Sequence, residues 1–184
     1  RFDIAFKLLY LELREKNYSL AKEIYKDHIR AFSLNKFTEP GNKHKNSLKK
    51  FIDNFERTFQ NIKKNGFNKN ESILPLSKNN SIANGAHRLS SSIYLNKEIS
   101  AVNIDSEDHT YDYKFFYARN VPKLFLDFAA QNFIEFSSNI YIAFIWPSAK
   151  GFNVDLENII PNVVYRKDIM FNLKGAHNLL SQIY

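Results

Sequence analysis

The apolar pattern that opens the middle third of the chain constrains the fold most strongly. It follows Ser47, a residue type that caps helices, and it stops before Gly66, a residue type that ends them. Between these positions apolar residues recur at helical spacing on one stripe: Leu48, Phe51, Ile52, Phe55, Phe59 and Ile62. Such a stripe has to be covered by other elements, so we expect a long helix that supplies core rather than a ligand site.

Short apolar segments follow this helix. Residues 72–76 and 81–83 flank Lys78-Asn79-Asn80, which predicts two strands joined by a hairpin turn. Positions 86–95 then predict a helix, and the alternation over 99–104 predicts another strand. The middle third is therefore expected to fold as helix, strand, strand, helix and strand.

The flanking segments add further elements. Residues 2–13 predict a helix, and Ser19 is expected to cap a second helix that completes a helical hairpin. Four elements are expected after position 104: a helix over 121–136 opened by Pro122, strands over 140–145 and 163–171, and a final helix over 173–183. The prediction is one α+β domain over 1–184, with a helical region (1–46), a core (47–104) and a C-terminal extension (105–184).

Composition narrows the function classes. The chain has 184 residues, 44% of them hydrophobic, but no run approaches the roughly 18 apolar residues that span a bilayer. Residues 1–13 carry Asp3, Lys7 and Glu12, so we expect neither a signal peptide nor a membrane anchor. The absence of cysteine removes disulfides, thiolate metal sites and cysteine nucleophiles, and is compatible with a cytoplasmic location, which we expect.

The net charge of +7 favours anionic partners: nucleotides, nucleic acid or an anionic membrane surface. Charge alone does not choose among them. Most lysines are scattered among asparagines, as on a solvated surface. The densest basic cluster consists of Lys43, His44, Lys45, Lys49 and Lys50.

A phosphate site is predicted at Asn84-Gly85-Ala86-His87-Arg88. A strand that turns sharply through glycine into a helix presents free main-chain N–H groups and the positive end of the helix dipole at one point. Here Gly85 allows close approach, Arg88 and His87 add charge or donors, and Ser90 and Ser91 add hydroxyls. The alternative is a plain turn, with Arg88 paired to a surface carboxylate.

The stretch from Phe51 to Ile104 resembles the ParB/sulfiredoxin superfamily in its order of elements. The resemblance rests on a helix ending "IKKNGF", followed by "SILPLSKNNSIANGAHRLSSSIYLNKEISAVNI". Members of that superfamily hold nucleotide phosphates with the glycine-containing loop: ParB proteins are CTP-dependent DNA clamps, sulfiredoxins are ATP-dependent reductases, and free serine kinases are phosphotransferases. The resemblance implies nucleotide binding more strongly than any one reaction.

The loop residues separate these activities. Sulfiredoxin chemistry is excluded because its cysteine would fall at or beside Ala86. The ParB loop has an acidic residue and two arginines, of which this chain keeps only Arg88. Kinase-like members carry an Asp-Gly-His-x-Arg type of loop, which "NGAHR" matches at Gly85, His87 and Arg88, with Asn84 in place of the acid. The resemblance therefore implies an ATP-dependent phosphotransferase that acts on a hydroxyl of a sugar or amino acid, with Mg²⁺ implied by the chemistry.

Because Asn84 replaces the acid, a catalytic carboxylate is expected from elsewhere. Glu39 is the preferred candidate, since its Pro-Gly turn lies close to where kinase-like relatives supply their base. The other candidates follow the strand over 99–104: Asp105, Glu107 and Asp108. His87 is a second catalytic candidate, and His28 and His44 are candidates for substrate recognition, each with a core or surface histidine as the alternative.

Two other functions stay open. One is a non-catalytic ParB-like module that binds nucleotide or DNA, although no separate helix-turn-helix segment is evident. The other is a catalytically inactive scaffold. The motif "GAHRLSSSIY" at 85–94 also recurs as "GAHNLLSQIY" at 175–184, but Asn178 replaces the arginine there, so we expect no second anion site.

Overall fold

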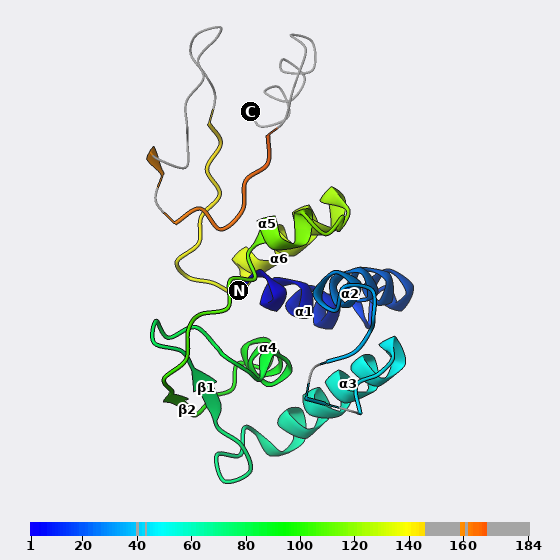
Figure 1. The fold of residues 1–184 in the computed structure, drawn as a ribbon, viewed down its shortest axis with the longest axis vertical. Coiled ribbons are helices and arrows are strands. Elements are labelled where there is room, and N and C mark those ends of the chain that lie inside the picture. Colours follow the sequence, from blue (N-terminus) through cyan, green and yellow to red (C-terminus); the bar gives the residue numbers. More distant parts are fainter. Residues whose placement is uncertain (40, 43, 146–158, 161, 169–184) are drawn as a thin grey trace, which may run out of the picture. The chain divides into compact units, whose positions relative to one another are not determined.

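The computed structural model describes residues 1–39, 41–42, 44–145, 159–160 and 162–168. The chain divides into two compact units, Arg1–Phe152 and Asn153–Tyr184. In the described part of the second unit, Arg166 Nε donates to Asp168 Oδ1 at 2.9 Å. The helices and strands named below belong to the first unit (Figure 1).

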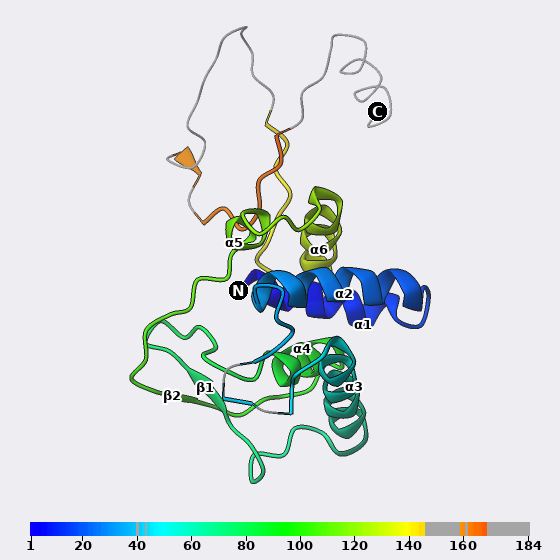
Figure 2. The same ribbon diagram turned by 45° about the vertical axis from the view of Figure 1, so that its right-hand side comes forward.

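A buried helix lies at the centre of the first unit. In α1 (Phe2–Leu13) the residues from Phe2 to Leu11 are all buried. Three helices cover it on different sides: α2 (Tyr18–Phe32), α4 (Ala86–Tyr94) and α6 (Lys123–Glu135). Figure 2 shows α2 alongside α1, with α4 and α6 on opposite sides of the pair. The predicted helical hairpin is confirmed, but the predicted cap Ser19 is wrong: Asn17 Oδ1 accepts from the Leu20 main-chain N–H at 3.1 Å.

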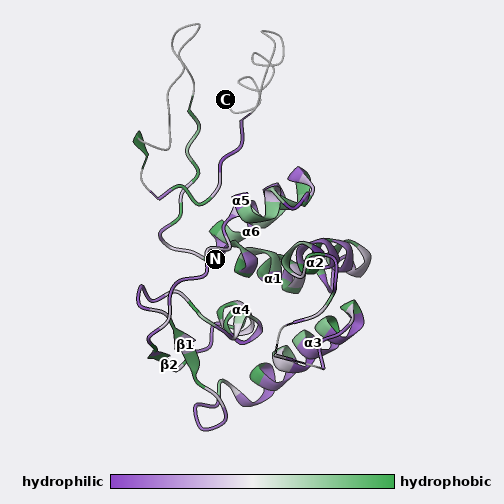
Figure 3. Cartoon of the chain, in the orientation of Figure 1, coloured by the Kyte–Doolittle hydropathy of each residue, from purple (hydrophilic) through white to green (hydrophobic). Residues whose placement is uncertain are grey.

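The predicted long helix is present as α3 (Leu48–Asn65). Ser47 caps it, and Gly66, with φ +73°, follows its end. Its apolar stripe is buried, and Phe55 packs 5.5 Å from the ring of Tyr10 on α1. Figure 3 shows hydrophobic and hydrophilic residues on different sides of this helix. The prediction that the stripe forms core is confirmed.

A small parallel sheet carries the segment before α4. Strand β1 (Leu74–Leu76) pairs in parallel with β2 (Ala101–Asn103), in the register Leu74 with Ala101. The predicted hairpin turn is present, because Ser77 N donates to Ser81 O at 2.8 Å and an antiparallel bridge joins Leu76 to Ile82. Helix α4 (Ala86–Tyr94) is the crossover between the two strands and packs against α1 and α3.

Two helices follow the sheet. Asp112 caps the short α5 (Tyr113–Tyr117), because its Oδ1 accepts from the Phe115 main-chain N–H at 2.8 Å. Helix α6 (Lys123–Glu135) confirms the helix predicted over 121–136. No described helix combines the length and the apolar character needed to cross a membrane.

The predicted C-terminal strands are not confirmed. Residues 140–145 form no strand, and Tyr141 and Phe144 are more than 80% exposed. A strand needs a neighbour for its main-chain groups, and no described segment pairs with these residues. Residues 163–168 also form no strand. The rest of that predicted strand and the helix over 173–183 lie outside the described residues, as does the second "GAH" motif. The α+β fold class is confirmed.

Candidate functional site

The turn between β1 and α4 is built around one glycine. Gly85 has φ +90° and ψ +28°, a left-handed conformation that glycine adopts without strain. Its surroundings leave no room for a side chain, since an added Cβ would lie 2.4 Å from Leu74 Cδ2 and 2.7 Å from Arg88 Nη2. Asn84 Oδ1 accepts from the Gly85 main-chain N–H at 2.6 Å. Only glycine therefore fits here, as the sequence motif predicts.

The first turn of α4 presents main-chain donors without a cap. Gly85, at the N-cap position, has no side chain with which to accept from the N–H groups of the first turn. The carbonyl of Gly85 is already used by the Leu89 N–H at 3.0 Å. The positive end of the helix is thus directed at the exposed residue Asn84.

The guanidinium of Arg88 folds back beside this helix start. Its contact with Gly85 and its bonds to Ser72 Oγ and to the carbonyl of Ile73 (3.5 Å) hold it between α4 and the segment that leads into β1. No carboxylate among the described residues forms an ion pair with Arg88, and partial burial lowers its pKa. Arg88 also lines a surface depression bounded by α3 and residues 66–72. An open, unneutralised guanidinium beside free helix amides is an arrangement that binds oxyanions.

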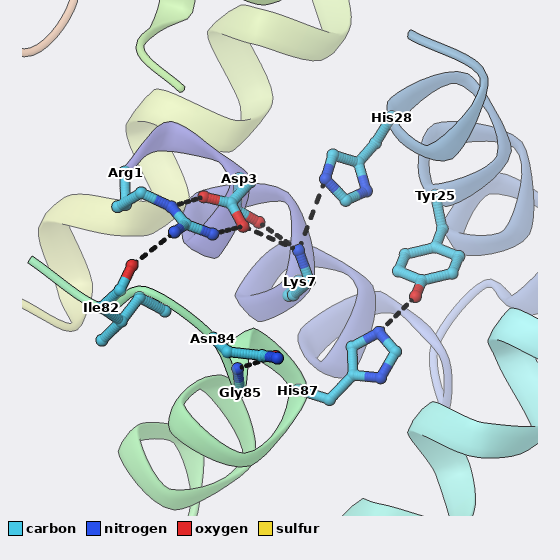
Figure 4. Close-up of polar contacts among 9 residues, drawn as sticks. All are labelled: Arg1, Asp3, Lys7, Tyr25, His28, Ile82, Asn84, Gly85 and His87. Carbon is cyan, nitrogen blue, oxygen red and sulfur yellow. Dashed lines mark hydrogen bonds and ion pairs between the residues drawn. The ribbon is translucent and has the colours of Figure 1, made fainter. Parts of the chain in front are cut away.

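His87 points the opposite way, into the core. Its Nε2 accepts from the Tyr25 hydroxyl at 2.8 Å (Figure 4). Its Nδ1 donates to Asn54 Oδ1 at 3.3 Å, and its ring stacks on Phe55 with centroids 4.4 Å apart. Burial, reinforced by the charge of Lys7, holds the pKa of His87 well below its ordinary value. The ring is therefore neutral at pH 7, and the group that His87 offers at the helix start is its main-chain N–H.

A buried ionic cluster lies behind the helix start. Asp3 accepts from Arg1 Nε at 2.7 Å and from Lys7 Nζ at 3.0 Å, and Arg1 Nη1 donates to the carbonyl of Ile82 at 2.6 Å, two residues before Asn84 (Figure 4). Burial alone would raise the pKa of Asp3, but Lys7 and Arg1 hold it below its usual range. Two cations share one carboxylate, so the cluster carries a positive excess close to α4.

Sequence reasoning missed this cluster. Asp3 and Lys7 are four residues apart in a helix whose other positions up to Leu11 are largely apolar. Charged residues inside a helix that is hydrophobic on all sides are buried with partners, and that pattern was the available signal. Nothing in the local sequence indicates that Arg1 joins them, since its position depends on the packing of α1 against the residues before α4.

The candidate base Glu39 lies in the loop between α2 and α3. Its Oε2 is 2.8 Å from Lys45 Nζ and accepts from Asn42 Nδ2 at 3.3 Å. The charge of Glu39 contributes to the raised pKa of the buried Tyr25, and that of Lys45 to the lowered pKa of His87. Among the described residues, no hydrogen bond or ion pair joins Glu39 to α4.

The other candidate carboxylates lie elsewhere. Lys78 pairs with Asp105 at 3.0 Å and with Glu107 at 2.9 Å, while Asp108 accepts from Ser77 and Asn79. All three are therefore bound to the hairpin turn after β1. Among the described residues, no group of three or more histidines, aspartates or glutamates is placed to hold a metal ion.

The remaining candidate residues are not gathered at the helix start. His44 is exposed, and His28 is fully buried, with its Nε2 3.5 Å from Lys7 Nζ. Ser90 and Ser91 are fully buried on α4, and their hydroxyls have no hydrogen-bond partner among the described residues. Comparison with protein families, curated proteins and solved structures finds no match to this chain.

Proposed function

We propose that the start of α4 binds the phosphates of a nucleotide, and that the chain transfers phosphate from it to a hydroxyl of a small substrate such as a sugar or an amino acid. The observation that carries the proposal is the guanidinium of Arg88, which lies beside Gly85, faces an open depression and has no carboxylate partner among the described residues. Uncapped amides and a free guanidinium together match the oxygens of a polyphosphate.

The charges around α4 support a highly charged ligand. Lys7 and Lys45 lie near enough to His87 to lower its pKa; Lys45 is paired with Glu39, whereas Lys7 shares the carboxylate of Asp3 with Arg1. A polyphosphate would relieve this positive excess, whereas a neutral ligand would not. ATP is the preferred nucleotide because the loop resembles that of kinase-like proteins.

In the proposed reaction the acceptor hydroxyl forms a bond to the terminal phosphorus, the bond from that phosphorus to the bridging oxygen breaks, and the nucleoside diphosphate leaves. Glu39 is the group that would take the hydroxyl proton. Mg²⁺ would enter with the nucleotide, because this ion is commonly held by one or two carboxylates together with substrate phosphates. It would supply charge neutralisation at the phosphates.

Calorimetric titration with ATP, CTP and GTP in the presence of Mg²⁺ tests the binding step. We expect ATP to bind, Arg88→Gln to weaken binding by roughly tenfold or more, and the exposed control Lys63→Gln to have little effect. Glu39→Gln should leave nucleotide binding intact and slow transfer to a panel of sugars and amino acids by about 10² to 10⁴. Absence of nucleotide binding by the wild-type chain would overturn the proposal.

A second candidate is a non-catalytic module that binds nucleotide or DNA phosphates. It is favoured by three exposed cations on and after α3 that have no carboxylate partner among the described residues: Arg57, Lys64 and Lys69. If this candidate is right, DNA affinity falls steeply with salt, because phosphate contacts release counterions, and no phosphate is transferred.

A further inference from the structure

A surface depression lies beside Arg88, and the proposed phosphate site at the start of α4 does not occupy it. It has a volume of about 670 Å³, within the usual size of a small-ligand site, and lies between the second half of α3 and residues 66–72. Arg88 is shared between the two places, because its guanidinium contacts Gly85 and also lines the depression. A ligand in the depression would therefore lie next to a phosphate at the start of α4.

The charges that line the depression are mostly positive. The lining contains three cationic residues and one carboxylate: Arg57, Lys64 and Arg88 against Glu71. Arg57 makes no hydrogen bond or ion pair within the described part of the chain, so its five N–H donors are available. Arg88 uses Nη1 on Ser72 and Ile73, which leaves its other N–H groups for a ligand.

The chemistry of this lining indicates an anion rather than an uncharged group. Guanidinium groups bind carboxylates and phosphates through paired hydrogen bonds, and a partly desolvated one gains most from an opposite charge. The base and ribose of a nucleotide carry no charge that could satisfy Arg57 and Arg88. An acceptor with a carboxylate or phosphate beside its hydroxyl carries the negative charge that these two guanidinium groups need.

We propose that the depression binds the anionic group, a carboxylate or a phosphate, of the hydroxyl compound that accepts the phosphoryl group. This inference rests on the proposed phosphotransferase, which it deepens by naming the acceptor class. Arg57 is the residue that recognises the acceptor without serving the nucleotide, and Arg88 serves both ligands. Asn61 and Asn68 also line the depression. Their side-chain oxygens already accept from Asn65 Nδ2 at 2.6 Å and from the Asn70 main-chain N–H at 3.0 Å, so their side-chain NH₂ groups are what they offer to the acceptor.

Three small probes test the proposal in the full chain: D-glycerate, glycerol 3-phosphate and glycerol as the uncharged control. Binding is followed by NMR through the main-chain amides and the arginine Nε–H signals. We expect one or both anionic probes to shift the signals of Arg57, Arg88 and residues 66–72, and glycerol to shift none of them. The probe that binds more tightly distinguishes a carboxylate acceptor from a phosphate acceptor.

Variants then locate the site. Arg57→Gln should weaken the affinity for the bound probe by roughly tenfold or more. The control is Lys63→Gln, an exposed residue on the same helix outside the depression, which should leave that affinity unchanged. Equal binding of glycerol, shifts confined to other regions, or an equal effect of both variants would overturn the proposal. ATP titrated into the wild-type sample separates the two hypotheses. If the chain binds an anionic probe but not ATP, the proposed function is rejected. If it binds ATP but neither anionic probe, the acceptor site is rejected.

Discussion

Gly85 packs so closely against Leu74 that a methyl group on its Cα would lie 2.4 Å from Cδ2 of that leucine. Leu74 is fully buried in β1 and cannot move aside easily. This contact fixes the start of α4 directly on the sheet, with Arg88 folded over it. The geometry of the candidate phosphate site therefore depends on the absence of one side chain.

Gly85→Ala should destabilise the protein strongly. The left-handed backbone costs about 1–2 kcal/mol for alanine, and overpacking against Leu74 adds about 1–3 kcal/mol. Gly41→Ala is the control, because Gly41 also has a positive φ (+77°) but has nothing within 4 Å of an added Cβ. Urea unfolding measures both variants. Equal losses of unfolding free energy would show that the contact with Leu74 is unimportant.

Asp3→Asn should be among the most damaging substitutions. Asp3 is 0% exposed and is the shared partner of Arg1 and Lys7, so its loss leaves two cations without their counter-charge. Removal of one member of a buried ion pair costs about 3–5 kcal/mol. The double variant Asp3→Leu with Lys7→Met should recover part of this loss in thermal or urea unfolding, and a double variant no more stable than Asp3→Asn would argue against the pairing.

Stability should fall between about pH 7 and pH 5. Burial holds the pKa values of His28 and His87 well below 6.5, so the unfolded chain takes up protons in this range while the folded chain does not. Each histidine then lowers the unfolding free energy by about 1.4 kcal/mol per pH unit below its ordinary pKa. Asp3, whose pKa is depressed in the fold, adds stability that is lost only under more acidic conditions.

His87→Gln tests this assignment, because glutamine keeps polar groups for Tyr25 and Asn54 but does not titrate. Unfolding free energies measured at several pH values should show about half the wild-type slope. An unchanged slope would mean that His87 is already protonated in the folded protein, or that it titrates normally there.

Ser91→Ala should leave the protein equally stable or more stable. The Ser91 hydroxyl is fully buried, with no hydrogen-bond partner in the described part of the chain. Such a state costs about 1–3 kcal/mol, and alanine is also the better helix former. Nucleotide affinity should not change, because the hydroxyl cannot reach solvent without rearrangement of α4. A marked loss of nucleotide affinity would show that the Ser91 hydroxyl contacts the nucleotide after all.

The sequence predicts the local elements of this fold well. Helix α3 begins and ends where its cap Ser47 and its stop Gly66 indicate, since both signals act within one helical turn. Residues 140–145 show the limit of such reasoning: an apolar run indicates burial, but whether a strand forms depends on a partner segment that local sequence does not specify.

The candidate site is predicted in part. The motif predicts the glycine turn at Gly85. It also predicts His87, Ser90 and Ser91 as phosphate ligands, but the structure buries all three side chains. The helical spacing of His87, Ser91 and Tyr94 was the signal for a stripe that faces the core. The depression and the place of Arg1 beside Asp3 could not be anticipated, because both depend on which distant segments meet near α4.

The central claim, phosphate capture at the start of α4, is tested most directly by an NMR titration of the ¹⁵N-labelled chain with ATP and Mg²⁺. We expect the largest shifts at the main-chain amides of Gly85, Ala86 and His87 and at Nε–H of Arg88. Saturable ATP binding that shifts other regions and leaves these four signals unchanged, or no binding at millimolar ATP, would contradict it.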